Sequence, residues 1–188
     1  SSIIQQQIDF VKAMEVCGVS KERRAQKESP LTPKEHKGYR SILGGLLWTT
    51  RTRADLSAEL GELQRFLAEP EAQHLMAAYA LLRRAKDTAE MAVLRYRQQP
   101  EGPKRLVLDP DSSFNNRTDL KRRSRAGWTV ILMAGLEESF DSDCAHVLNW
   151  ASRALNRVTK STPSAEGIGH ATALEDGVRV AGWLHEIE

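Results

Sequence analysis

Three acidic side chains lie beside the clearest strand and helix signals in the second half of the chain. Asp109 and Asp111 end or follow the aliphatic run RLVLD (105–109), and Glu166 stands in the first turn of a later helical pattern. Carboxylate oxygens are the hard ligands that Mg²⁺ prefers, and a pair of such ions can activate a water and stabilise a leaving oxygen. Two of these acids also have a structural explanation: the helix dipole favours Glu166, and a turn after Pro110 favours Asp111.

Three strands and a helix must position these acids. The strand candidates are RLVLD (105–109), GWTVILMA (127–134) and CAHVLNWAS (144–152), each short and rich in aliphatic or β-branched residues. Three consecutive strands with short links predict an antiparallel meander with a helix packed on one face. The helix is expected from Pro163 onward, because apolar residues recur there at helical spacing. Its predicted inward face comprises Ile168, Ala171, Leu174, Val178, Ala181 and Leu184.

The first half of the chain reads as helical. Residues 37–66 are rich in Leu, Ala, Glu and Arg, and a second helix is expected from Pro70 to about Lys86. Residues 20–35 are polar and contain two prolines, which predicts a linker. Composition changes near residue 98, at a turn-rich break. The sequence therefore predicts an α+β fold, with a helical region over 1–97 and a strand-and-helix region over 98–188.

Length and composition exclude several classes of protein. The chain has 188 residues, of which 40% are hydrophobic, enough for a modest core. No apolar run approaches the roughly 18 residues of a membrane span, so no membrane partner is expected. The first ten residues lack the pattern of a secretory signal. Two cysteines cannot build a disulfide framework, which favours an intracellular location, cytoplasmic or nuclear.

Charge is unevenly distributed although the net charge is only +2. Residues 20–40 carry seven Lys and Arg against three Glu, and residues 137–143 carry four acids without a base. A second basic segment, 117–125, is expected either to contact the phosphates of a nucleic acid or to be an exposed hairpin loop. Its cations are Arg117, Lys121, Arg122, Arg123 and Arg125.

Five motifs in order give the chain a family resemblance. Each is weak alone, but together they cover nearly the whole sequence, and they resemble the C-terminal part of the copia-type retrotransposon polyprotein, from the end of reverse transcriptase into RNase H. Residues 39–57 resemble the family's Tyr-Arg-Ser and Thr-Arg-Pro-Asp segments, and residues 149–167 resemble its Ser-Trp-Ser-Ser to Thr-Glu-Ala-Glu stretch. The other matching segments are 63–88, 110–116 and 123–132.

The resemblance implies a fold, an activity and partners. Residues 1–97 would be a reverse-transcriptase connection region, and 98–188 a partial RNase H-like domain of three antiparallel strands and a helix. The parent activity would be Mg²⁺-dependent hydrolysis of the RNA strand in an RNA–DNA hybrid. Asp111 matches the first catalytic aspartate, with Asp109 as the competing choice, and Glu166 matches the metal-binding glutamate. The partners would be the hybrid and the rest of the polyprotein.

Departures from the family pattern leave an alternative open. The family's later catalytic carboxylates would lie beyond Glu188, and an acidic insertion occupies 136–143. The chain is therefore expected to be incomplete on its own as an endonuclease. The alternative is a non-catalytic remnant that acts as a nucleic-acid-binding module or as a helical protein-interaction module.

Overall fold

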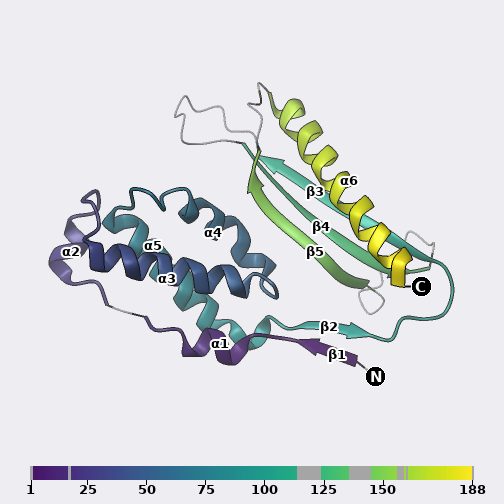
Figure 1. Cartoon of the computed structure of the whole chain (residues 1–188), viewed down its shortest axis with the longest axis horizontal. Helices are drawn as coiled ribbons and strands as arrows, with labels where there is room; N and C mark the ends of the chain where they lie inside the picture. Colours follow the sequence, from purple (N-terminus) through teal and green to yellow (C-terminus); the bar gives the residue numbers. More distant parts are fainter. Residues whose placement is uncertain are drawn as a thin grey trace. The chain divides into compact units, whose positions relative to one another are not determined.

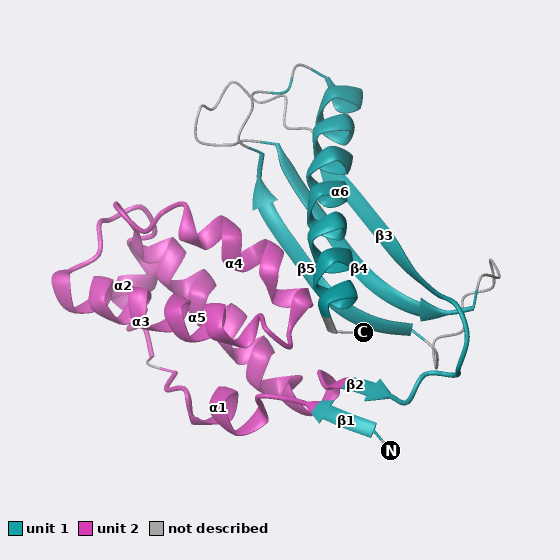
Figure 2. Cartoon of the chain, turned by 45° about the vertical axis from the view of Figure 1, so that its right-hand side comes forward, with its two compact units in different colours: residues 1–4, 95–188 teal, residues 5–94 magenta. Residues whose placement is uncertain are grey.

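A computed structural model describes residues 2–16, 18–113, 124–135, 145–155, 159 and 161–187. The chain divides into two compact units, coloured separately in Figure 2. One unit, residues 5–94, is helical. The other, residues 1–4 and 95–188, contains the main sheet and the C-terminal helix. No helix in the described part of the chain is both long and apolar enough to cross a membrane.

The helical unit packs its helices around one apolar core. Fully buried core residues come from α3, α4, α5 and the turn between α3 and α4; Tyr39, Leu46, Leu56 and Leu82 are 0% exposed. Tyr39 also donates a hydrogen bond of 2.6 Å from its hydroxyl to the carbonyl of Leu63. The elements are α1 (Ile8–Ala13), α2 (Lys21–Ala25), α3 (Pro33–Thr49), η1 (Ala54–Leu56), α4 (Ser57–Gln64), α5 (Ala72–Asp87) and η2 (Ala89–Met91).

The predicted linker over residues 20–35 is wrong, because side-chain caps start two helices inside it. The Ser20 hydroxyl accepts from the backbone of Arg23 and opens α2. Thr32 and Glu35 form a reciprocal capping box at the start of α3, which satisfies backbone donors that the first turn leaves unpaired. Pro33 then occupies the first helical position, where its missing N–H costs little.

The helical region expected over 37–66 is interrupted. Helix α3 ends at Thr49, and a short turn leads through Arg53 into η1 and α4. The next helix starts at Ala72 rather than at Pro70, because Glu71 caps it and its N–H donates to Nδ1 of His74 at 2.9 Å.

The sheet unit is an antiparallel meander followed by one long helix (Figure 1). Strands β3 (Lys104–Ser113), β4 (Arg125–Ala134) and β5 (Ala145–Ala154) pair in the order β3-β4-β5, and α6 (Thr162–Ile187) contacts β3 and β4. The predicted α+β class, with three antiparallel strands and a helix, is confirmed. A separate pair of short strands, β1 (Ser2–Gln5) and β2 (Leu94–Arg97), lies outside this sheet.

Strand β3 continues past the predicted end at Asp109. Pro110 pairs with Trp128 and Asp111 pairs with Gly127, without a break in register. A proline is tolerated on an edge strand because its missing N–H can lie on the unpaired side. Asp111 is therefore inside a strand, and the explanation of it as a turn residue is wrong.

The predicted inward face of the last helix is also largely wrong. The buried apolar side chains of α6 are Ala165, Ala173 and Val180, whereas Leu174 is 58% exposed and Val178 65% exposed. Glycines set this orientation. A side chain at Gly177 would stand 2.7 Å from Cδ2 of Leu108, and one at Gly169 would collide with the Ser112 hydroxyl. The helix turns its smallest residues toward the sheet, where close approach excludes larger ones.

Candidate functional site

The three predicted acids lie at one end of the sheet unit. Asp109 and Asp111 are both exposed on the edge strand β3. Glu166 is exposed on α6, one turn before Gly169, which packs against Ser112. Among the described residues, none of these three carboxylates forms an ion pair or a side-chain hydrogen bond. They are therefore accessible to a ligand from solvent.

Strand alternation separates the aspartates from the helix. Leu108 and Ser112 contact glycines of α6, so the even-numbered residues of β3 face the helix. Asp109 and Asp111 have the opposite parity and point from the other face of the sheet. The two aspartates share one face, whereas Glu166 belongs to the helix that covers the other. The structure brings Asp109 and Asp111 together but does not bring Glu166 to them.

The fit of these residues to a magnesium ion is partial. Their oxygen donors are of the right chemical type for a hard cation. Their geometry is divided, because the two aspartates share one face of β3 and Glu166 lies on the helix over the other face. The described part of the chain contains no group of three His, Cys, Asp or Glu side chains able to hold a metal ion. The assignment of Asp111 and Glu166 as catalytic, metal-binding residues, with Asp109 as the alternative, stays a prediction.

Glu166 lies deeper in its helix than predicted. It is the fifth residue of α6, which begins at Thr162. The helix dipole acts mainly over the first turn, so it explains an acid at this position less well than the sequence suggested. The carbonyl of Glu166 contacts Nδ1 of His170 at 2.8 Å, and that contact involves the backbone and leaves the carboxylate free.

Only one of the predicted phosphate-contacting residues lies in the described part of the chain. Arg125 opens β4 and donates from Nη2 to the carbonyl of Ser152 at 3.3 Å. This contact holds the arginine along β5. The remaining cations Arg117, Lys121, Arg122 and Arg123, together with the acidic insertion 136–143, lie outside the described residues.

The sequence analysis missed a buried carboxylate on the side of α6 that faces the sheet. Asp176 is 4% exposed. Its Oδ2 accepts from Nε1 of Trp128 at 2.8 Å and from Nδ2 of Asn149 at 2.6 Å, and Arg179 pairs with its other oxygen. The acid thus ties α6 to both β4 and β5. The spacing of Ala173, Asp176 and Val180 places it on a helical face with small apolar residues, which was the available signal.

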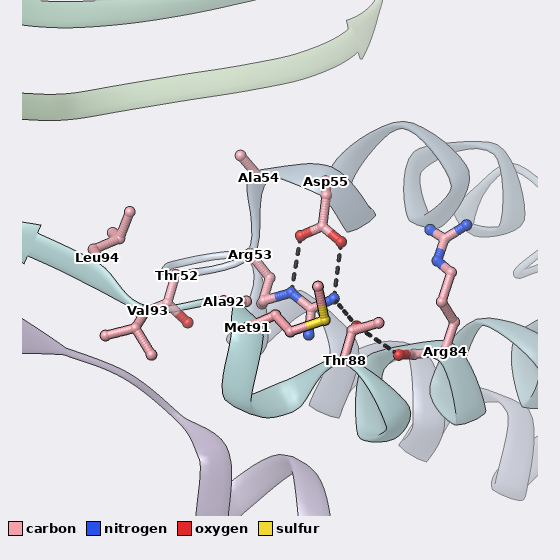
Figure 3. Close-up of a pocket in the computed structure, with 10 residues that line it drawn as sticks. All are labelled: Thr52, Arg53, Ala54, Asp55, Arg84, Thr88, Met91, Ala92, Val93 and Leu94. Carbon is pink, nitrogen blue, oxygen red and sulfur yellow. Dashed lines mark hydrogen bonds and ion pairs between the residues drawn. The ribbon is translucent and has the colours of Figure 1, made fainter. Parts of the chain in front are cut away.

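A pocket of about 460 Å³ in the helical unit is built around a second buried charge (Figure 3). Arg53 is 3% exposed. It binds Asp55 through Nε at 2.9 Å and Nη2 at 2.8 Å, and it also donates to the carbonyl of Ala85 and the hydroxyl of Thr88. Four of its five N–H groups are thus used within the protein. The remaining lining residues include Met91, Ala92 and Val93.

Ion pairs in the helical unit hold acid pKa values down. The hydrogen bonds from Arg53 lower the pKa of Asp55, against an opposing effect of burial. The hydrogen bond from Arg23 is the largest cause of the lowered pKa of Glu35, which falls to about 2. These carboxylates are already neutralised by arginine, so they are structural rather than candidate metal ligands.

The comparisons with known proteins give one relative. The chain is 34% identical over 129 residues to a transposon Ty5-1 protein of Saccharomyces cerevisiae. The match covers 68% of this chain and 37% of that protein. No protein-family profile and no solved structure matches the chain. The sequence is therefore related to a transposon protein, and it spans little more than a third of that relative's length.

Proposed function

We propose that the chain is a segment of a retrotransposon polyprotein whose sheet unit has RNase H-type ancestry. The supporting observation is the order of elements, three antiparallel strands of one sheet followed by a helix. Asp109 and Asp111 lie on the first of these strands, and Glu166 lies in the helix. The relationship to a transposon protein agrees with it. The parent reaction would be Mg²⁺-dependent hydrolysis of the RNA strand in an RNA–DNA hybrid.

In this proposal the chain contributes only part of a metal site. Asp111, or Asp109 in its place, and Glu166 would each supply carboxylate oxygens to Mg²⁺, whose role in such reactions is to activate water and stabilise the leaving oxygen. The aspartates lie on one face of the sheet, whereas Glu166 lies on the helix that covers the other face. This chain by itself is therefore expected to cleave slowly or not at all. The rest of the polyprotein would complete the site.

The test is cleavage of a hybrid labelled on its RNA strand, with and without Mg²⁺, by this chain and by a polyprotein segment that extends beyond it. Mg²⁺-dependent cleavage by the longer protein, abolished by Asp111→Asn and by Glu166→Gln, is expected. Glu175→Gln is the matched control, because Glu175 is an exposed acid of the same helix. Cleavage that survives Asp111→Asn but not Asp109→Asn would move the metal ligand to Asp109. Full activity in Asp109→Asn, Asp111→Asn and Glu166→Gln alike would refute the assignment.

A second candidate is a non-catalytic remnant that binds nucleic acid or another protein. The separation of the carboxylates favours it, since carboxylates that share no metal ion repel one another and are not expected to lie close together. Salt-dependent hybrid binding without cleavage, by both the chain and the longer protein, is the result that would select it. A stable protein complex that is indifferent to nucleic acid would instead select the helical interaction module.

A further inference from the structure

The outward face of α3 carries cations and no acid. Successive residues of a helix are 100° apart, so the exposed positions of α3 fall within an arc of about 140°, opposite the buried Tyr39 and Leu46. The one acid of α3, Glu35, lies off this arc and is bound to Arg23 at 2.9 Å. Arg51 follows the helix on the same side. The outward face consists of Pro33, Lys34, Lys37, Arg40, Ser41, Gly44, Leu47, Trp48 and Arg51.

The first three cations of this face are unpaired within the described part of the chain. Lys34, Lys37 and Arg40 form no ion pair or hydrogen bond there. Elsewhere in the same unit, exposed or half-exposed cations do find acids: Lys12 pairs with Glu90, and Arg84 pairs with Glu59. The helix dipole also disfavours cations near a helix N-terminus. Helix stability therefore does not explain the charges of this face.

An aromatic platform continues the cationic row. Trp48 is 47% exposed and Leu47 is 51% exposed, contrary to the usual burial of tryptophan. The guanidinium of Arg51 lies 3.9 Å from the centre of the Trp48 ring. At 1.5 Å per residue, the row from Lys34 to Arg51 is about 25 Å long. Cations that follow a backbone, combined with an exposed ring on which a base can stack, are typical of single-strand binding.

We infer that the outward face of α3 binds a single nucleic-acid strand, with its cations on the phosphates and Trp48 stacked on a base. The contacts are to the backbone and to the face of a base, so the binding is independent of sequence. This inference goes beyond the proposed function. It concerns the helical unit, it uses none of the carboxylates, and its ligand is unpaired strand rather than hybrid.

The test uses the full chain and a labelled single-stranded DNA of mixed sequence, with affinity measured between 50 and 200 mM salt. The variant Lys37→Gln/Arg40→Gln/Arg51→Gln keeps good helix formers. It is expected to lose about 2 from the slope of log affinity against log salt, because each phosphate contact on a single strand contributes about 0.7. The control Lys12→Gln/Arg65→Gln/Arg84→Gln removes the same charge from ion-paired positions and is expected to keep the slope.

The stacking step is tested separately. Trp48→Ala is expected to weaken single-strand binding about tenfold and to leave binding of a blunt DNA duplex unchanged, with circular dichroism as the check of folding. An unchanged slope in the α3 variant, equal losses in both triple variants, or binding of anionic vesicles in place of DNA would overturn the inference. Asp111→Asn should leave single-strand binding intact, so failure here and failure of the proposed function are separate outcomes.

Discussion

The helical unit and the sheet unit bury charge in different ways. In the helical unit Arg53 takes its carboxylate from Asp55, two residues along the chain, and fastens the turn before α4 to the end of α5. In the sheet unit Asp176 accepts from a donor on β4 that is 48 residues away and from a donor on β5 that is 27 residues away. In the first network only the carboxylate can be read from neighbouring residues, because the bonds to Ala85 and Thr88 span 32 and 35 residues. The second exists only after the sheet has formed and α6 has packed on it.

The difference teaches where ligand chemistry can lie. Both charges are buried and bonded to groups of other elements, so neither is exposed to a substrate from solvent. The groups left free are at the surface: the acids of β3 and α6 in one unit, and the cations of α3 in the other. Burial therefore separates the charges that hold the fold together from the charges that a ligand could reach, and residue type does not.

The largest expected effect breaks the local network. Arg53→Leu removes the four hydrogen bonds to Asp55, the carbonyl of Ala85 and the hydroxyl of Thr88, and it should cost about 3–5 kcal/mol of unfolding free energy, because hydrogen bonds to a charged group contribute about 1.5–3 kcal/mol each. Hydrogen exchange should rise throughout the helical unit and much less in the sheet unit. Arg51→Gln, an exposed neighbour, should change stability by less than about 0.5 kcal/mol. Equal effects of the two changes would contradict the role given to Arg53.

The matching change in the sheet unit should be somewhat smaller. Asp176→Leu strands the indole N–H of Trp128 and the amide of Asn149, at a cost of about 2–4 kcal/mol. Urea unfolding followed by tryptophan fluorescence is the measurement, since Trp128, Trp150 and Trp183 all lie in the sheet unit. Glu175→Leu, on the exposed side of the same turn, is the control. A stability change confined to the helical unit would show that Asp176 does not pin α6.

The third expected effect is a loss of stability of the helical unit at low pH. The pKa of Glu35 is lowered to about 2 by Arg23, so its contribution is complete above the ordinary value of 4.5 and is lost as pH falls toward 2. We expect the helical unit to lose about 1–2 kcal/mol over that range. The double variant Arg23→Gln/Glu35→Gln should lack this part of the pH dependence. The same acid profile in the double variant would exclude the pair as its cause.

The smallest effect compares two glycines of α6. Gly182 faces open space, so Gly182→Ala should stabilise the sheet unit by about 0.5–1 kcal/mol through helix propensity. Gly177→Ala would press against Leu108 and should be neutral or destabilising by about 1 kcal/mol. Thermal unfolding of the two variants measures the difference. Equal stabilisation by both would mean that α6 does not approach the sheet as closely as the structure shows.

Much of the fold could be predicted from the sequence. The strand centres, the last helix and the α+β class follow from short-range pattern, because side-chain period and propensity are local properties. The predicted element boundaries were wrong where a helix cap or an edge strand overrode local propensity. The caps are Thr32 and Glu71, and the edge-strand position is Pro110. The acids of the candidate site could be predicted from residue type and order along the chain. Which face of the sheet each acid lies on could not.

The sequence by itself determined the order of the three main strands and the last helix, the gathering of seven cations in residues 20–40 and the acids of β3 and α6. Only the tertiary structure decided which side of α6 meets the sheet. An apolar count favoured Leu174 and Val178, yet close approach required Gly169 and Gly177, because packing depends on the space between backbones rather than on hydrophobicity alone. That orientation of α6 buried Asp176, exposed Leu174 and Val178, and left Glu166 on the helix that covers the face of the sheet opposite to Asp111.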